Sequence, residues 1–180
     1  VPIAGDQITN DVAVAFRTPT QSAEEIKIKH GCALRQLADA REVVEVPGVD
    51  GRDPRQLSVR TLAEVIEPRV VELYEFVLGE LRRSGMEEMI ASGIVITGGS
   101  SLMKGMVELG EEIFHMPVRL GMPRNVGGLS EVVGNPRYAT GVGLVLMGQQ
   151  QVERQLQGQM ESNSFSQVLS RMKSWFQGNF

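Results

Sequence analysis

A pair of glycines after a short apolar run is the first feature that could do chemistry. The sequence TGGSS at positions 97–101 follows the β-branched residues Ile94, Val95 and Ile96. A strand that ends in two glycines and opens a helix lets backbone amides approach a ligand closely, and the helix N-terminus favours an anion. No lysine follows at the P-loop position, so this is not that motif. The same residues would equally form a tight strand-to-helix turn that binds nothing.

The second candidate is an acid–base pair on a predicted helix. Glu24 and Lys27 are three residues apart in SAEEIKIKHG, so they share one helix face. They could hold a polar ligand or form a solvated ion pair. Ser22 and Glu25 match a capping box at the start of this helix, and Gly31 suits a left-handed stop at its end.

The third candidate lies in the sequence EPRVVE at positions 67–72. Arg69 and Glu72 also share a helix face. The arginine could bind a carboxylate in a bidentate manner, and the glutamate could accept from a cation or a backbone donor. The alternative is a surface salt bridge worth less than about 1 kcal/mol.

The fourth candidate is an amphipathic helix over residues 164–180. Ser164 suits its N-cap and Gly178 its end, and the polar face carries Arg171 and Lys173. The helix is too short to span a bilayer, and its make-up is that of an in-plane membrane anchor. The alternative is a helix that docks on its own domain. Its narrow apolar stripe comprises Phe165, Val168, Leu169, Met172, Trp175 and Phe176.

Other residue types give weaker signals. His30 and His115 have no ligand spacing, and we interpret both as structural or surface residues. Four methionines suit core or interface packing rather than a cofactor site. We predict no catalytic residue and no metal site. These methionines are Met86, Met89, Met103 and Met106.

Composition limits the classes of function. The chain has 180 residues, of which 42% are hydrophobic and 22% charged, so it can bury an ordinary globular core. Its formal net charge of −4 and its isoelectric point near 5.3 argue against a general nucleic-acid binder. The single cysteine, Cys32, cannot form an internal disulfide, which fits a reducing compartment.

The elements that must position these candidates alternate between helix and strand. Pro68 interrupts a long helical pattern, which predicts two helices or one kinked helix. A strand, a glycine turn, a helix and a second strand then form an α/β pattern. We expect helices over 8–16, 23–30, 58–83, 102–114 and 138–147, and strands over 42–49, 94–97 and 117–121.

The ends of the sequence have their own features. No apolar run is long enough to span a membrane, and no signal peptide is evident. The opening VPIA reads as the end of a strand, which predicts that the sequence is the C-terminal part of a longer protein. Residues 150–163 are rich in glutamine and predict a linker that spans about 20 Å.

Two of these segments, taken in order, resemble the adenosine-binding half of the actin-like ATPase superfamily. They are AEEIKIKHG (23–31) and GIVITGGSSLMKG (93–105). Within that superfamily the sequence resembles the FtsA family of bacterial cell-division proteins over nearly its whole length. The resemblance is carried by VPIAGDQITNDVA, FRTPTQSAEEIKIKHGCAL, AEVIEPRVVELYEF, EEIFHMPVRLGMP and SWFQGNF.

The resemblance implies an α/β fold, a truncated half of the actin-like (ribonuclease H-like) ATPase fold with a flexible linker and a C-terminal amphipathic helix. The phosphate loops and the Mg²⁺ ligands would lie upstream of Val1. By the same resemblance, 1–5 end a strand of subdomain 2A, 6–86 form subdomain 2B, 87–149 form the rest of 2A, 150–163 form the linker and 164–180 form a membrane-targeting helix.

The resemblance also implies an ATP site with Mg²⁺ in the full-length protein. The acid–base pair would flank the adenosine, and the glycine loop would pass under the purine and ribose. Ile28 would give an apolar contact where related chaperones place an arginine. The chain alone is not expected to bind ATP tightly or to hydrolyse it. The implied contacts are Glu24, Lys27, Ile28, Gly98, Gly99 and Ser100.

The implied function is that of a non-enzymatic adaptor in cell division. Arg69 and Glu72 would contact the C-terminal peptide of FtsZ, and the tail would hold the protein to the cytoplasmic face of the inner membrane at the septum. The family also implies self-association into filaments, contacts with other division proteins and no nucleic-acid partner. The alternatives are an ATPase or kinase fragment whose tail docks on its own domain, and an actin-like adaptor of pilus assembly.

Overall fold

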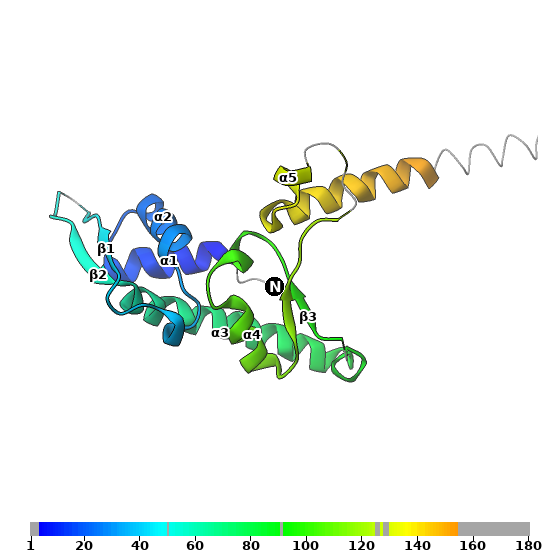
Figure 1. Ribbon diagram of the computed structural model, residues 1–180, viewed down its shortest axis with the longest axis horizontal. Helices are drawn as coiled ribbons and strands as arrows, with labels where there is room; N and C mark the ends of the chain where they lie inside the picture. The colour runs from blue at the N-terminus through cyan, green and yellow to red at the C-terminus, as the bar shows by residue number, and fades with distance from the viewer. Residues whose placement is uncertain (1–3, 50, 91, 125–126, 128–129, 155–180) are drawn as a thin grey trace, which may run out of the picture. The chain divides into compact units, whose positions relative to one another are not determined.

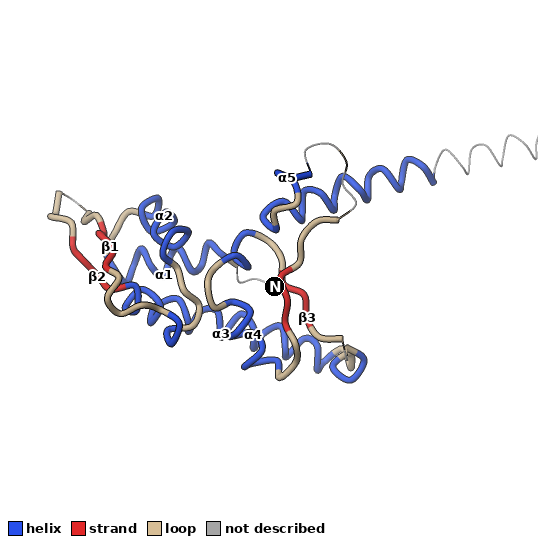
Figure 2. Tube along the Cα trace, viewed as in Figure 1, coloured by secondary structure: helices blue, strands red, loops and turns tan. Residues whose placement is uncertain are grey.

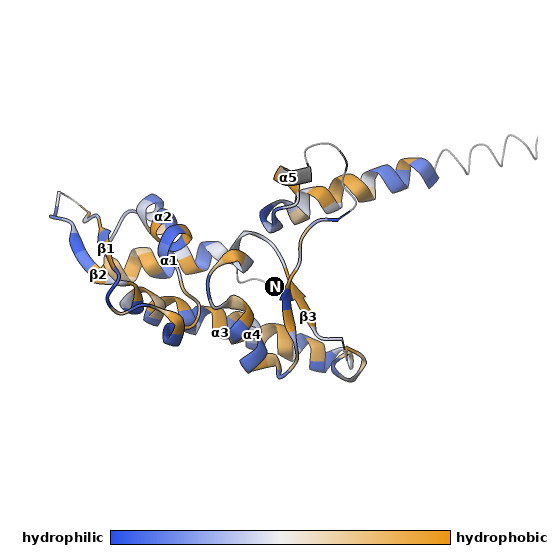
Figure 3. Cartoon of the chain, viewed as in Figure 1, coloured by the Kyte–Doolittle hydropathy of each residue, from blue (hydrophilic) through white to orange (hydrophobic). Residues whose placement is uncertain are grey.

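The computed structural model describes residues 4–49, 51–90, 92–124, 127 and 130–154. Contacts divide the chain into two units, Val1–Ala139 and Thr140–Phe180, and each is described by itself. The core cluster lies in the first unit and draws on helices and strands alike. In Figure 3, apolar and polar segments alternate along its helices, as expected for elements that bury one face.

The chain begins with two packed helices, α1 (Gly5–Phe16) and α2 (Thr20–His30) (Figure 1). Ile8 and Val12 of α1 and Ala23 and Ile26 of α2 are buried in the core. Arg17, with a φ of 46°, ends α1 in the left-handed conformation. Both predicted helices are therefore confirmed, and each starts three residues earlier than expected.

The predicted ends of α2 are wrong. The helix follows Pro19 and has no side-chain cap, so Ser22 and Glu25 lie inside it and form no capping box. Gly31 ends α2 in an extended conformation, with φ −60° and ψ 137°, instead of the left-handed one. A Cβ at Gly31 would overlap the backbone carbonyl oxygen of Lys27. The close approach of these two backbone segments therefore explains why the residue at position 31 is a glycine.

Strands β1 (Val43–Val46) and β2 (Arg55–Ser58) form an antiparallel hairpin, in which Val43 pairs with Ser58 and Val46 with Arg55. The first strand confirms the prediction over 42–49. The second strand was not predicted, because only Leu57 among its four residues is apolar, and its last residue, Ser58, is the predicted start of a helix. The Arg55 guanidinium donates to the Phe16 carbonyl, which ties the hairpin to the end of α1.

Helix α3 (Val59–Arg83) runs unbroken for 25 residues through Pro68, so the pattern forms one helix and not two. The Ser58 hydroxyl accepts from the Thr61 amide at 3.1 Å and caps the N-terminus. Buried residues continue on both sides of the proline, and this packing offsets the missing backbone hydrogen bond. They are Leu62, Ala63, Ile66, Val70, Tyr74 and Leu78.

A strand–helix–strand unit follows. Strand β3 (Ile94–Ile96) pairs in parallel with β4 (Val118–Leu120), and the 3₁₀ turn η3 (Gly99–Leu102) and helix α4 (Met106–Phe114) connect them (Figure 2). The predicted α/β pattern is confirmed. The strand itself is not buried within the described residues, since Val95 is 48% exposed.

Tyr74 fastens α4 to α3. Its hydroxyl donates to the Met106 carbonyl at 2.9 Å, and its ring lies 5.1 Å from that of Phe114. Burial raises the pKa of Tyr74 well above its usual range, which keeps the hydroxyl a donor. A backbone bridge between Cys32 and Lys104 then brings the end of α2 beside the segment between η3 and α4.

Residues predicted as loop contain two short turns, α5 (Ser130–Val133) and the 3₁₀ turn η4 (Pro136–Tyr138). The Gly98 amide donates to the Pro136 carbonyl at 3.2 Å. This bond joins the glycine loop to η4, although 38 positions separate the two residues. It brings a second segment to the side of the predicted ligand loop.

One helix covers 139–154, and it includes all the described residues of the second unit, 140–154. It extends beyond the predicted end at Met147, through residue 154. Residues 155–180, with most of the predicted linker and the predicted tail helix, lie outside the described residues. Among the described helices, none has the length and apolar character needed to cross a membrane.

Candidate functional site

A pocket of about 380 Å³ lies where the start of α1, one face of α2 and η3 meet. Five of the six predicted adenosine contacts line it, although they come from positions 24–28 and 99–100. The sixth, Gly98, directly precedes η3. We call this cavity the α2 pocket. The predicted residues that line it are Glu24, Lys27, Ile28, Gly99 and Ser100.

Lys27 is a buried structural tie within the α2 pocket. Its ammonium group donates to the Gly5 carbonyl at 3.1 Å, to the Thr9 hydroxyl at 2.7 Å and to Glu24 Oε2 at 2.5 Å. A lysine has three N–H donors, and all three are used. Lys27 therefore joins α1 to α2 and positions Glu24, and it has no N–H donor left for a ligand.

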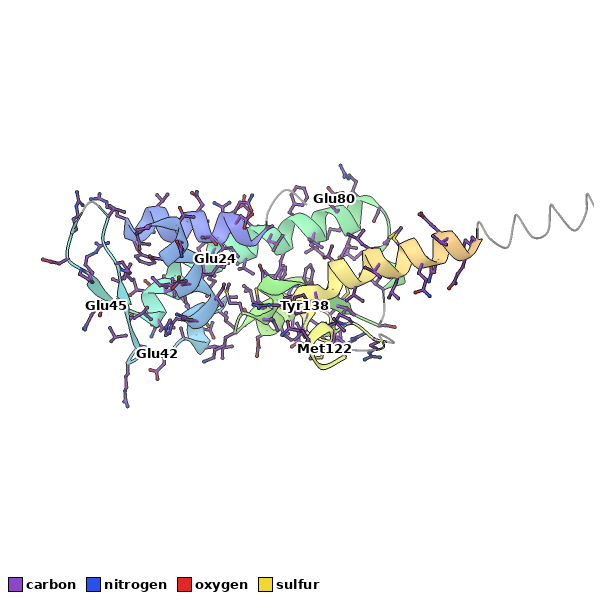
Figure 4. The ribbon with its side chains drawn as sticks, turned by 90° about the horizontal axis from the view of Figure 1, so that it is seen from above. Glu24, Glu42, Glu45, Glu80, Met122 and Tyr138 are labelled. Atoms are coloured by element: carbon purple, nitrogen blue, oxygen red, sulfur yellow. The ribbon has the colours of Figure 1, made fainter. Side chains whose placement is uncertain are left out.

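Glu24 is the accessible member of the pair. Its side chain is 41% exposed and projects from α2 beside α1 (Figure 4). Oε2 accepts from both Thr9 and Lys27, whereas Oε1 accepts from none of the described residues. Burial raises the pKa of this carboxyl, but hydrogen bonds from Lys27 and Thr9 and the charge of Lys27 bring it below the usual 4.5. Glu24 is thus an ionised acceptor at neutral pH.

The glycine loop is open toward the pocket side. Gly98 has a φ of 97°, which only glycine adopts readily, and nothing lies within 4 Å of a Cβ built at Gly98 or Gly99. The Ser101 hydroxyl closes the loop by donating to the Gly98 carbonyl at 2.7 Å. The loop opens a 3₁₀ turn of four residues instead of the predicted longer helix, so the helix-terminus argument for an anion loses its support.

Sequence reasoning missed several residues of the α2 pocket. Leu102 and Met103 join Ile28, which is 61% exposed, as apolar lining, while Asp6 and Arg137 add charged groups. Arg137 had no signal in the sequence, because it follows a stretch that reads as loop. An apolar lining with a few charged groups is typical of small-molecule sites.

The second candidate site is on α3. Arg69 Nε donates to Asp11 Oδ2 at 2.6 Å, Nη2 donates to Asp11 Oδ1 at 3.0 Å, and Nη1 donates to Glu72. Asp11 belongs to α1 and was missed, because 58 positions separate it from Arg69. Glu67 takes a separate role, since its carboxylate accepts from the Arg35 amide at 2.5 Å. The predicted 67–72 stretch is therefore divided between two neighbours of α3.

A family model described as "Cell division protein FtsA" matches residues 1–143. The chain belongs to the FtsA family. Cell division protein FtsA of Pseudomonas aeruginosa is 56% identical over 186 residues, and that of Escherichia coli K12 is 41% identical over 192 residues. Both alignments include the whole of this chain and 45% of the relative, so the chain spans about half the length of these proteins.

Solved structures show the fold of this FtsA-family chain. MreB 5 of Spiroplasma citri bound to AMPPNP matches 88% of this chain and 47% of its own, with a TM-score of 0.64 and 14% identity. The same protein bound to ADP matches 67% of this chain with a TM-score of 0.53. The chain therefore has part of the actin-like fold, as predicted. The α2 pocket and Arg69 both lie within the residues that the FtsA model matches.

The remaining predicted residues of the FtsA-family chain have diverse surroundings. His30 lies 3.0 Å from Glu42, and His115 follows α4 in the left-handed conformation. Met106 is in the core, Met103 lines the α2 pocket, and two further methionines, Met86 and Met89, are exposed. Within the described residues, no group of three or more histidine, cysteine or acidic side chains could hold a metal ion.

Proposed function

We propose that this FtsA-family chain belongs to a non-enzymatic adaptor in cell division, which tethers FtsZ filaments to the cytoplasmic face of the inner membrane at the septum. The observation that carries the proposal is the accessible Arg69–Glu72 pair on α3, in a chain that matches the FtsA family over 1–143. In this proposal, Arg69 and Glu72 bind the C-terminal peptide of FtsZ. Residues 6–86 form subdomain 2B and residues 87–149 the rest of 2A.

The α2 pocket takes the adenosine of ATP in this proposal. Glu24 Oε1 accepts from none of the described residues, so it can accept from a ribose hydroxyl, and Ile28 offers the base an apolar surface. MreB 5, which shares the fold, was crystallised with AMPPNP. Magnesium and the phosphates would be held by parts of the longer protein, and nucleotide binding would support filament formation instead of catalytic turnover.

The tail supplies the membrane contact. A short amphipathic helix with two cationic residues binds a bilayer reversibly, as a single lipid chain does. Filaments present many such helices on one surface, so avidity strengthens a weak individual step. Assembly of the actin-like body thereby controls how long the adaptor and its FtsZ filaments stay at the membrane, where they help to assemble the septal ring with other division proteins.

The FtsZ contact is tested by fluorescence anisotropy with a labelled synthetic peptide of the Pseudomonas aeruginosa FtsZ C-terminus. Arg69→Glu removes the donors and adds repulsion, so we expect its dissociation constant to rise at least about tenfold. Arg60→Glu, an equal charge change at an exposed position of the same helix, is the control. Equal affinity of the Arg69 variant and the unmodified chain would remove the site.

The membrane contact is tested by co-sedimentation with liposomes that contain anionic lipid. Trp175→Glu places a charge on the apolar stripe and should abolish binding, whereas Gln177→Glu makes the same charge change beside the stripe and should retain most of it. Unchanged sedimentation of the Trp175 variant would contradict the anchor.

The nucleotide site is tested with Gly99→Val in a full-length FtsA that carries this region. Apart from the two neighbouring residues, no described atom lies within 4 Å of a Cβ built at Gly99, so the new side chain would enter the space proposed for the ligand without a clash at its Cβ. We expect loss of binding of a fluorescent ATP analogue with unchanged circular dichroism. Retained affinity would place the nucleotide elsewhere.

A further inference from the structure

Asp11 is the partner of Arg69 that no sequence pattern indicated. Its two oxygens take Nε and one N–H of Nη2, at 2.6 and 3.0 Å, and so fix one edge of the guanidinium. Both side chains remain partly accessible, at 29% exposure for Arg69 and 26% for Asp11. A bidentate pair of this kind sets the plane of the arginine. The guanidinium of Arg69 is therefore already oriented before a partner binds.

The cluster retains donors despite these bonds. A guanidinium has five N–H groups, and Asp11 and Glu72 occupy three of them. One N–H on Nη1 and one on Nη2 donate to none of the described residues. Arg69 can therefore still donate to an incoming carboxylate without losing Asp11.

The charge of the cluster opposes a carboxylate that comes alone. Two carboxylates, those of Asp11 and Glu72, surround one guanidinium, so the cluster carries an excess of one negative charge. An acidic group that reaches the free donors meets repulsion from both. A cation beside it would be attracted, because Glu72 is 55% exposed and has no bond besides that to Arg69 within the described residues.

Apolar side chains adjoin the charges. Val14 lies three positions after Asp11 on α1 and is 69% exposed, and Phe76 lies four positions after Glu72 on α3 and is 40% exposed. Residues three and four apart share a helix face. We call these two residues, with Asp11, Arg69 and Glu72, the Arg69 surface.

We propose that Asp11 makes the Arg69 surface selective for a peptide that presents an acidic and a basic side chain together, next to an apolar residue. The free N–H groups of Arg69 take the acid, and Glu72 takes the base. Asp11 positions the arginine and makes the base necessary, because its charge must be offset. This inference rests on the proposed function, since it concerns the same peptide site.

The test compares two peptides on two proteins. The first peptide is the FtsZ C-terminal peptide, and in the second its Lys and Arg residues are replaced by Gln. On the unmodified full chain we expect the replacement to weaken binding by up to about fivefold, the upper value for one exposed ion pair. Asp11→Asn removes the charge and keeps one acceptor oxygen for Arg69, in place of the two that Asp11 supplies. On this variant we expect that penalty to fall by half or more. Asp53→Asn, an exposed acid in the 51–54 turn, is the matched control and should keep the full penalty.

Two further measurements distinguish an effect of the Asp11 charge from a loss of structure in the variant. Asp11→Glu keeps the charge and should restore the penalty. On the unmodified chain, high salt should shrink the difference between the peptides, and this readout needs no variant that must fold. An equal penalty on the unmodified chain and on Asp11→Asn would overturn the role of Asp11 while leaving the proposed function intact. No binding of the first peptide to the unmodified chain would overturn both.

Discussion

Single residues decide how the α2 pocket responds to its surroundings. Lys27 uses all its N–H donors inside the protein, so Glu24 alone of the predicted pair is left to meet a ligand. The motif was predicted to offer a ligand two charged groups. In the structure the lysine is used within the protein, so the exposed group is the Glu24 carboxylate, which Lys27 holds in place through their ion pair.

The first prediction concerns acid. The folded-state pKa of Glu24 is lowered, so its ionised form contributes stability above pH 4.5, and this contribution is lost as the pH falls through and below that value. We expect the urea midpoint to drop between pH 6 and pH 4 by more in the unmodified chain than in Glu24→Gln. Glu25→Gln, an exposed carboxylate on the same helix, should behave as the unmodified chain does. An identical drop in all three would show that Glu24 does not contribute.

At the scale of elements, α3 organises the first unit, since it contacts α1, α4, η1 and β2. Arg69 faces α1, Glu67 faces η1, and Tyr74 reaches α4. Figure 4 shows Glu80, near the end of α3, far from Glu45 of strand β1 and from Glu42, which directly precedes that strand. Because α3 is uninterrupted through Pro68, it fixes the distance between Arg69 and the β1–β2 hairpin.

The second prediction compares two glycines. Gly79 lies inside α3 with nothing within 4 Å of a Cβ, so Gly79→Ala should stabilise the chain by about 0.5–1 kcal/mol through helix propensity. Gly31→Ala would push a Cβ into the Lys27 carbonyl and should cost about 1–3 kcal/mol. Urea unfolding followed by circular dichroism measures both. Equal effects of the two substitutions would show that the close approach at Gly31 is relieved without cost.

Most elements could be predicted from sequence, because helix and strand periods link residues close along the chain. The periodic residues of α3 and the β-branched run of β3 are examples. Contacts between distant segments could not be predicted. Asp11 meets Arg69, and Gly98 meets Pro136, only because the fold closes loops that carry no pattern of their own. The capping box at Ser22 failed because the helix starts earlier, after Pro19.

At the scale of the whole molecule, stability is unevenly distributed. Every member of the core cluster lies between Ile8 and Val118, within the first unit. The described helix of the second unit exposes Leu144, Val145 and Met147. The first unit therefore has the core expected of an independently folded body.

The third prediction follows from this distribution. Removal of residues 140–180 should change the free energy of unfolding by less than about 1 kcal/mol, because the core cluster of the described residues lies entirely outside this segment. Urea unfolding of the shortened and complete chains measures the difference. A loss of 2 kcal/mol or more, on the order of one buried apolar side chain, would favour a tail that docks on its own domain.

Cys32 is a built-in probe of how often the protein opens locally. It is the only cysteine in the sequence, its side chain is buried, and its backbone bridges to Lys104 where α2 meets the segment before α4. Thiol reagents attack the thiolate, and a buried apolar site withholds it from them. The rate of labelling therefore measures how often the end of α2 separates from the segment before α4, beside the α2 pocket. If a nucleotide slows the labelling of Cys32, the ratio of the two rates measures how far the nucleotide suppresses this opening, without an engineered probe.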